Sequence, residues 1–163
     1  MFEHTNKQFH ADLETTRSMF LKMGGVVEIM VKQAMEALFS GNLALVDEVL
    51  EHENQVDQLE VDIDERITNL IARNQPTAID LRMLLSVSKM LTDLERCGDE
   101  AERIARMSRR LHKSDSGYQP VVELRHMSNS VVHMINRALD AVARQDVVLA
   151  AEIVRSDREV NEE

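Results

Sequence analysis

Apolar residues recur every three or four positions along most of this chain, for about 30 residues at a time. The first such stretch runs from about residue 6 to residue 40. Gly41 and Asn42 then predict a helix end followed by a new helix start. In "RNQPTAID", Pro76 predicts a second break and Thr77 predicts the cap of a third helix. Long amphipathic helices with short connections favour a slender antiparallel bundle, about 45 Å long at 1.5 Å per residue.

The rest of the chain continues the helical pattern. "SDSGYQP", residues 114–120, is the only long predicted loop. A fourth helix is predicted from about Val121 and a fifth from about Asp146. Aromatic residues make up only 3% of the chain, which contains five glycines and two prolines, so the composition also favours helices over strands.

An internal repeat defines the architecture further. The segment from Met23 aligns without gaps with the segment from Met127, 104 residues later. Identical pairs include Met23/Met127, Val27/Val131, Met30/Met134, Ala34/Ala138, Ala37/Ala141, Leu45/Leu149, Glu48/Glu152 and Val56/Val160. We therefore expect an all-α fold, with a three-helix bundle over residues 6–113, a loop over residues 114–120 and the first part of a second, repeated bundle over residues 121–163. A counterpart of the third helix would fall beyond the last residue.

Carboxylates interrupt the apolar pattern at one level of the first bundle. Glu95 and Asp99 lie four residues apart in "LERCGDEAERIA" and share one helix face, although like charges at this spacing repel. Gly98, a poor helix former, lies between them. The antiparallel arrangement of the second and third helices places Glu53 level with Asp99, and Asp57 level with Glu95.

Several carboxylates beside a bundle core repel one another unless they are protonated or joined by cations. Hard cations such as Mg²⁺, Mn²⁺ and iron prefer oxygen ligands. The predicted metal ligands are Glu53, Asp57, Glu95 and Asp99. Additional members of this layer are Glu28, with Gly24 and Gly25 beside it, and the repeat counterparts Asp157 and Asn161. The alternative is an acidic, solvated helix face, which a chain with 29 acidic residues forms easily.

Charge and composition exclude several function classes. The net charge of −10 argues against nucleic-acid binding. No apolar run approaches the ~20 residues of a membrane span, the N-terminus lacks the pattern of a signal peptide, and the single Cys97 forms no disulfide within the chain. We expect a cytoplasmic protein. There is no glycine-rich phosphate-binding loop and no recognisable nucleophile, so we expect no enzymatic activity.

A basic stripe runs along the third predicted helix. Arg96, Arg103 and Arg110 lie seven residues apart. They form either a solvated face or a docking strip for an acidic partner or for anionic lipid near a membrane.

The run "QPTAIDLRMLLSVSKMLTDLERCGDEAERIA", together with "MGGVVE" and the internal duplication, resembles the PhoU family of bacterial phosphate-uptake regulators. The resemblance covers nearly the whole chain. It implies two similar three-helix bundles in a cytoplasmic protein that is often a homodimer. It also implies a non-enzymatic repressor of the phosphate-starvation response that contacts the phosphate transporter's ATPase subunit and a sensor histidine kinase.

The resemblance bears on metal as well. Family members carry E/D-x-x-x-D motifs that bind metal ions, often as multinuclear clusters, and the matching positions here are Glu53 and Asp57 with Glu95 and Asp99. Mg, Mn, Fe and Zn all remain open as the ion. The alternative function is a metal-binding helical scaffold, or a di-metal carboxylate protein, unrelated to phosphate signalling. A di-iron enzyme would use two Glu-x-x-His motifs, and the chain offers one, Glu123–His126.

Overall fold

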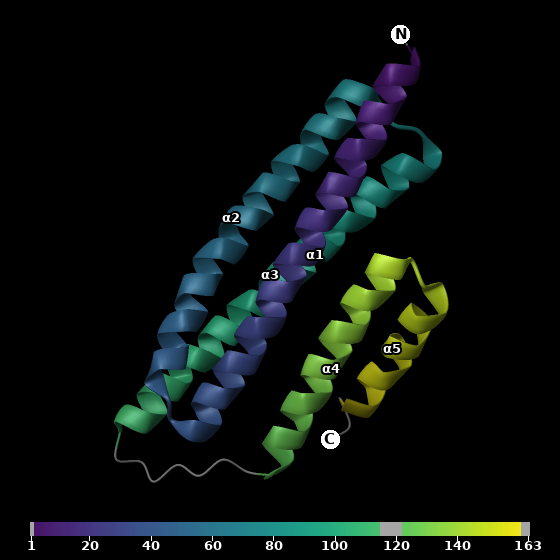
Figure 1. The fold of residues 1–163 in the computed structure, drawn as a ribbon. Helices are drawn as coiled ribbons and strands as arrows, with labels where there is room; N and C mark the ends of the chain where they lie inside the picture. The colour runs from purple at the N-terminus through teal and green to yellow at the C-terminus, as the bar shows by residue number, and fades with distance from the viewer. Residues whose placement is uncertain (1, 115–121, 161–163) are drawn as a thin grey trace.

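The protein is described by a computed structural model, which places residues 2–114 and 122–160, with side chains for residues 7–114 and 122–156. The described residues form five helices and no strand (Figure 1). The helices are α1 (Phe2–Ser40), α2 (Leu43–Asn74), α3 (Ala78–Lys113), α4 (Val122–Arg144) and α5 (Val147–Val160). The predicted all-α architecture is therefore confirmed, with α1, α2 and α3 as one long bundle and α4 and α5 as a hairpin beside α1.

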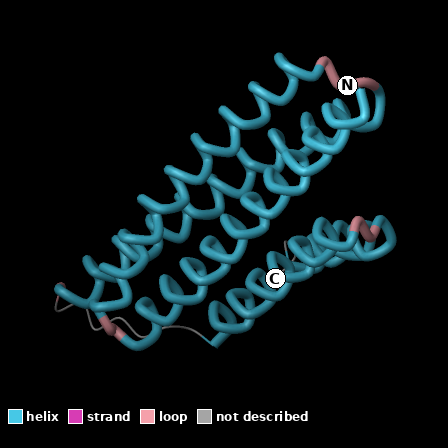
Figure 2. The backbone as a smooth tube through the Cα atoms, turned by 45° about the horizontal axis from the view of Figure 1, so that its top comes forward, coloured by secondary structure: helices cyan, strands magenta, loops and turns pink. Residues whose placement is uncertain are grey.

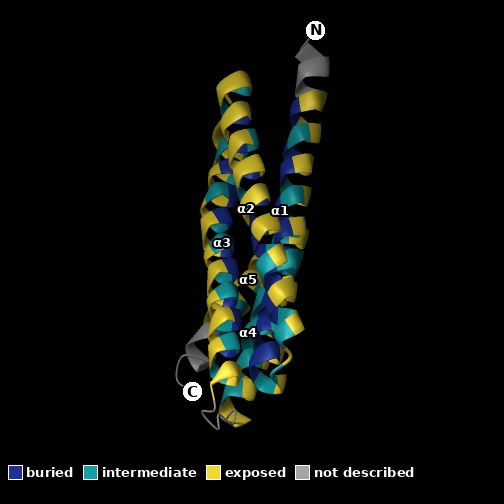
Figure 3. Ribbon diagram, turned by 90° about the vertical axis from the view of Figure 1, so that its left-hand side faces the viewer, coloured by how far each residue is buried: buried dark blue, intermediate teal, exposed yellow. Residues whose placement is uncertain are grey.

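The three long helices bury one apolar face each. Met23 and Met30 of α1, Ile63 of α2, and Leu84 and Leu91 of α3 are the largest fully buried apolar side chains. Figure 3 shows the buried residues on the inward sides of α1, α2 and α3 and the exposed residues on their outer sides. Burial of this continuous apolar seam is the main force that holds the bundle together.

Local chemistry sets the helix ends. Gly41 takes a φ of 73°, a left-handed conformation that glycine adopts without strain. Asn42 then caps α2, because its side-chain oxygen accepts a hydrogen bond from the Ala44 N–H at 3.1 Å. At the next turn Thr77 occupies the N-cap position of α3 as predicted, but its side chain makes no capping hydrogen bond.

The turn between α4 and α5, a short loop like the one between α1 and α2 in Figure 2, also shares its positive φ and its N-cap. Gln145, 104 residues after Gly41, also has a positive φ of 55°. Asp146, 104 residues after Asn42, caps α5 by accepting hydrogen bonds from the N–H groups of Val148 and Leu149, both at 3.0 Å. Helix α4 ends 104 residues after α1 ends, and α5 begins 104 residues after α2 begins. This agreement supports the duplication inferred from the sequence.

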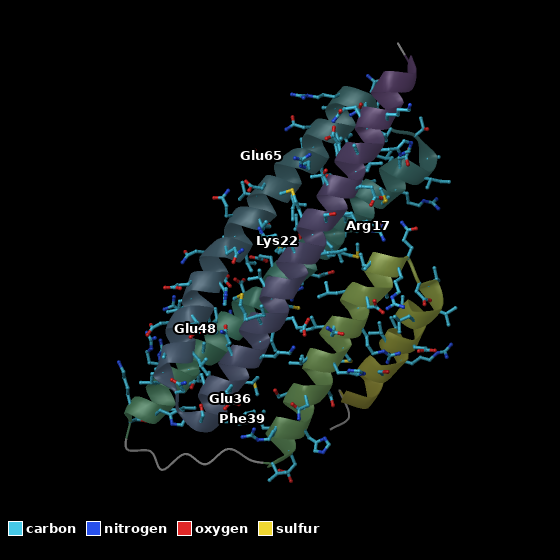
Figure 4. All side chains as sticks on the ribbon, viewed as in Figure 1. Arg17, Lys22, Glu36, Phe39, Glu48 and Glu65 are labelled. Carbon is cyan, nitrogen blue, oxygen red and sulfur yellow. The ribbon has the colours of Figure 1, made fainter. Side chains whose placement is uncertain are left out.

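Helix α4 packs antiparallel against α1. Toward the N-terminal half of α1, the Arg17 guanidinium donates hydrogen bonds to the carbonyl oxygens of Val142, at 3.2 Å, and Ala143 (Figure 4). Leu139 fills the space beside Gly24, where a Cβ would overlap its side chain. Toward the C-terminal end of α1, the Arg125 guanidinium lies 4.2 Å from the centre of the Phe39 ring.

The second repeat is less completely covered than the first. Met127, Val131 and Met134 are only half buried, although their counterparts in α1 are fully buried. An apolar groove of about 870 Å³ lies between α3 and α5, with α1 and α4 also contributing to its walls. Among the described residues, the α4–α5 hairpin lacks a third helix that would cover this groove.

Candidate functional site

Among the described residues, Glu53 is the only acidic residue whose side chain is buried, and it lies in the first bundle. It lies on α2 between the core residues Val49 and Val56, and only 8% of it is exposed. A Cβ placed on Gly98 of α3 would lie 3.3 Å from Glu53 Oε2. The glycine therefore leaves the space that the Glu53 carboxyl occupies, which explains a residue that otherwise weakens a helix interior.

The environment of Glu53 disfavours its charge. Burial is the main reason why its pKa rises from 4.5 to about 7, and the carboxylates of Asp57, Asp99 and Glu102 raise the pKa further. Its buried Oε2 atom has no hydrogen-bond partner among the described residues. An unpartnered buried oxygen of this kind requires a proton, a water molecule or a cation nearby.

The remaining predicted ligands are more exposed to solvent than Glu53. Asp57 and Asp99 are exposed, and Glu95 is half buried. Burial raises the pKa of Glu95, and the charges of Asp99, Glu60 and Asp57 act in the same direction. The antiparallel arrangement of α2 and α3 thus brings the four predicted carboxylates into one electrostatic cluster, as their spacing indicates.

Two members of the cluster were missed by the sequence reasoning. Glu102 adds to the field at Glu53, although it also pairs with Arg106 at 2.6 Å. Glu60 adds to the field at Glu95. Glu102 follows Glu95 by seven residues and so lies on the same side of α3, a periodic signal that could have identified it.

The donor chemistry of this cluster fits a hard cation, because its atoms are carboxylate oxygens and one of them is buried without a partner. The arrangement is not a closed coordination sphere. Within the described part of the chain, no three His, Cys, Asp or Glu side chains are placed to ligate one ion. Asp99 already hydrogen-bonds with the Glu53 carboxyl group, which raises the pKa of Glu53 further, and ligation of one ion requires a third carboxylate to move closer to this pair.

Glu28 does not join the cluster, contrary to expectation. It forms an ion pair with Lys32 and accepts a hydrogen bond from Asn136 of α4 at 3.1 Å. The hydrogen bond from Lys32 is the largest cause of a lowered pKa at Glu28, so its charge is already balanced. Gly24 likewise faces α4, and a Cβ on Gly25 would meet nothing within 4 Å. The antiparallel register predicts the level of these residues along the bundle correctly, but the rotation of α1 about its axis turns them away from the acidic cluster.

The predicted second-repeat ligands fall where side chains are not placed. Asp157 belongs to α5, but its side chain is outside the described residues, and Asn161 is outside them entirely. The three arginines of the predicted stripe, Arg96, Arg103 and Arg110, all lie exposed on α3. None of the helices described here has the length and apolarity needed to cross a membrane.

Comparison with known proteins places the chain in a family. Residues 20–108 and 124–163 match the family model for the PhoU domain. The phosphate-specific transport system accessory protein PhoU homolog of Pseudomonas aeruginosa is 42% identical over 160 residues, which cover 98% of this chain and 66% of that protein. The Escherichia coli K12 protein PhoU is 38% identical over 162 residues, covering 99% and 66% respectively. The chain thus spans about two thirds of the length of these relatives.

Solved structures agree with the sequence comparisons. The crystal structure of PhoU from Pseudomonas aeruginosa superimposes with a TM-score of 0.90 at 42% identity, covering 94% of this chain and 74% of that one. The phosphate transport system regulatory protein PhoU from Streptococcus pneumoniae has the same fold, with a TM-score of 0.85 at 23% identity over 94% of this chain and 72% of that one. The helices, the repeat and the sequence identity agree, and the chain belongs to the PhoU family.

Proposed function

We propose that this chain is part of a cytoplasmic, non-enzymatic regulator of phosphate uptake. In this proposal it represses the phosphate-starvation response when phosphate is plentiful, by contacting the ATPase subunit of a phosphate transporter and a sensor histidine kinase. The observation that carries the proposal is the match of both repeats to the PhoU domain, with relatives that are named accessory proteins of the phosphate-specific transport system. Long helices with extended outer faces provide surfaces for two protein partners, and we propose that the protein acts as a homodimer.

The acidic cluster has a structural role in this proposal. A divalent or trivalent cation held by Glu53, Asp57, Glu95 and Asp99 would neutralise their repulsion and join α2 to α3. The unpartnered buried oxygen of Glu53 supports this role. The alternative candidate is a metal-binding scaffold unrelated to phosphate. The same buried oxygen of Glu53 supports it, and it differs from the proposed function only in its partner proteins.

The regulatory role is tested by alkaline phosphatase activity in phosphate-replete cells whose chromosomal copy of the gene is deleted. We expect constitutive activity, which returns to a low level when the gene is restored. Low activity in the deleted strain would contradict the regulatory role and favour the scaffold.

The metal site is tested separately on the purified chain by measuring bound metal after dialysis against Mn²⁺ or Mg²⁺. Asp99→Asn should reduce the bound metal, because it removes a charged ligand from the cluster. Glu65→Gln is the matched control, since Glu65 is exposed on α2 away from the cluster (Figure 4). Equal metal content in both variants would refute the assignment of the site and would leave the regulatory role untouched.

A further inference from the structure

Helix α3 has a regular coiled-coil pattern along its whole length. Its buried residues alternate at intervals of three and four, which is the spacing of a heptad repeat. They are Leu84, Val87, Leu91, Leu94, Gly98, Ala101, Ala105 and Ser108. Because this seam repeats every seven residues, any other position that repeats every seven residues keeps a constant orientation relative to the bundle.

Five basic residues occupy one such position. They extend the three predicted arginines, Arg96, Arg103 and Arg110, by Arg82 and Lys89, and from here on the name basic stripe refers to all five. All five are exposed. Each lies midway between two buried seam positions on the opposite side of the helix, so the stripe points directly away from the bundle core. From the first to the last residue it extends about 42 Å along α3.

Most of the positive charge of the basic stripe is available to a partner. Arg96 approaches Asp93 at 3.9 Å and Arg103 approaches Glu100 at 2.7 Å, but all four side chains are largely exposed. Exposed ion pairs of this kind contribute little energy and exchange readily. The other three members of the stripe form no ion pair with any residue that the structure describes.

Two exposed apolar side chains flank the stripe near its ends. Leu85 is 49% exposed and Met107 is 56% exposed. They lie about 33 Å apart along α3. Methionine and arginine are enriched in protein interfaces, so Met107 beside the arginines fits such a surface, and Leu85 adds apolar area that a partner would bury.

We propose that the basic stripe, with Leu85 and Met107, is the docking surface for an acidic, amphipathic helix of a partner protein. A helix that runs along α3 and carries acidic residues every seven positions would meet all five cations in register. Apolar residues near the two ends of that helix would cover Leu85 and Met107. The inference rests on the proposed function insofar as it assumes that the chain works by binding other proteins.

An anionic membrane fits this surface less well. Asp93 and Glu100 line one side of the stripe, and Glu95 and Glu102 lie on the other side within the acidic cluster. A flat anionic surface would approach these carboxylates together with the arginines, in a chain whose net charge is −10. A helix is narrow enough to follow the row of cations between them.

The test uses two fluorescein-labelled synthetic helical peptides, each about 30 residues long, and the whole chain. One peptide carries glutamate at every seventh position and leucines spaced to match Leu85 and Met107. The other has the same composition with the glutamates at irregular positions. Fluorescence anisotropy should give at least about tenfold tighter binding for the regular peptide, because only it aligns charges along the stripe. The double variant Arg96→Glu/Arg103→Glu should lose at least about tenfold in affinity for that peptide.

Lys22→Glu is the matched control, because Lys22 is an exposed cation on α1 outside the stripe (Figure 4). It should leave binding of the regular peptide within about twofold. Equal affinity for the two peptides, or an equal loss in the control, would overturn the inference. Two further outcomes would also overturn it: stripe-dependent co-sedimentation with phosphatidylglycerol vesicles without peptide binding, or conversion of a dimer to a monomer by the double variant. Because the peptide assay contains no phosphate-signalling component, its failure is distinct from failure of the phosphatase experiment.

Discussion

Replacing Glu53 with glutamine should stabilise the bundle at alkaline pH in the absence of metal. The folded chain raises the pKa of Glu53 from 4.5 to about 7, so between these values the native state binds more protons at this site than the unfolded chain. The free energy of unfolding therefore falls as the pH rises through this window. Below pH 4.5 the protonated carboxyl carries no penalty, and above pH 7 the full penalty applies.

The expected magnitude follows from the pKa. At about 1.4 kcal/mol per pH unit, the displacement corresponds to about 3 kcal/mol. Solvent screens the exposed charges of Asp57 and Asp99, which reduces the expected penalty to about 2 kcal/mol. Glu53→Gln resembles the protonated side chain in shape and does not titrate. The variant should therefore exceed the original chain in stability by about 2 kcal/mol at pH 8 and by less than about 1 kcal/mol near pH 5.

Urea unfolding followed by circular dichroism, with a chelator present, measures this difference at both pH values. Glu65→Gln serves as the control and should follow the original chain at both. A Glu53→Gln variant that is less stable at pH 8, or whose advantage is the same at pH 5, would refute the account of a destabilising buried charge. Adding Mn²⁺ at pH 8 should then stabilise the original chain but not Glu53→Gln, because a ligand that binds only the folded state raises its stability.

Four further substitutions test the packing. Ser108→Ala should stabilise the bundle by about 1 kcal/mol in urea unfolding, because the Ser108 hydroxyl is buried without a partner among the described residues; a loss of stability would mean that it has one. Gly25→Ala should gain about 1 kcal/mol in stability from helix propensity. Gly24→Ala should be about 1–2 kcal/mol less stable than Gly25→Ala, because the new Cβ at position 24 crowds Leu139. Equal melting temperatures of the two variants would contradict this packing. Arg17→Ala should speed amide exchange in α4–α5 about tenfold while α2 stays unchanged, since the lost hydrogen bonds hold only the hairpin; unchanged exchange in α4–α5 would show that Arg17 does not hold it.

The fold was predictable because its determinants are local. Gly41 and Asn42 specify a turn through their own conformational and hydrogen-bonding preferences, and Asn42 caps α2 as expected. The burial of Glu53 was also predictable, because it interrupts an otherwise apolar stripe at helical spacing. Both inferences require only the helical period and the chemistry of single residues.

The orientation of Glu28 and Gly24 was not predictable in the same way. Their level along the bundle follows from the turn at Gly41, but level does not fix rotation about the helix axis. The rotation depends on α4, which fills the space beside Gly24 with Leu139 and offers Asn136 to Glu28. Contacts between segments more than 100 residues apart leave no periodic signal within either segment, so the sequence reasoning assigned these residues to the wrong neighbours.

The antiparallel packing of α1 against α4 has a consequence for the history of the fold. Exchanging the two repeats turns the pair Gly24–Leu139 into Ser128–Met35, two residues that line the same small groove between these helices. A packing arrangement that maps onto itself in this way has the symmetry of a two-fold dimer interface. A chain with a single repeat could make the same contact with an identical chain, with every interaction occurring twice. Gene fusion of such a pair would join the two halves without requiring a new interface.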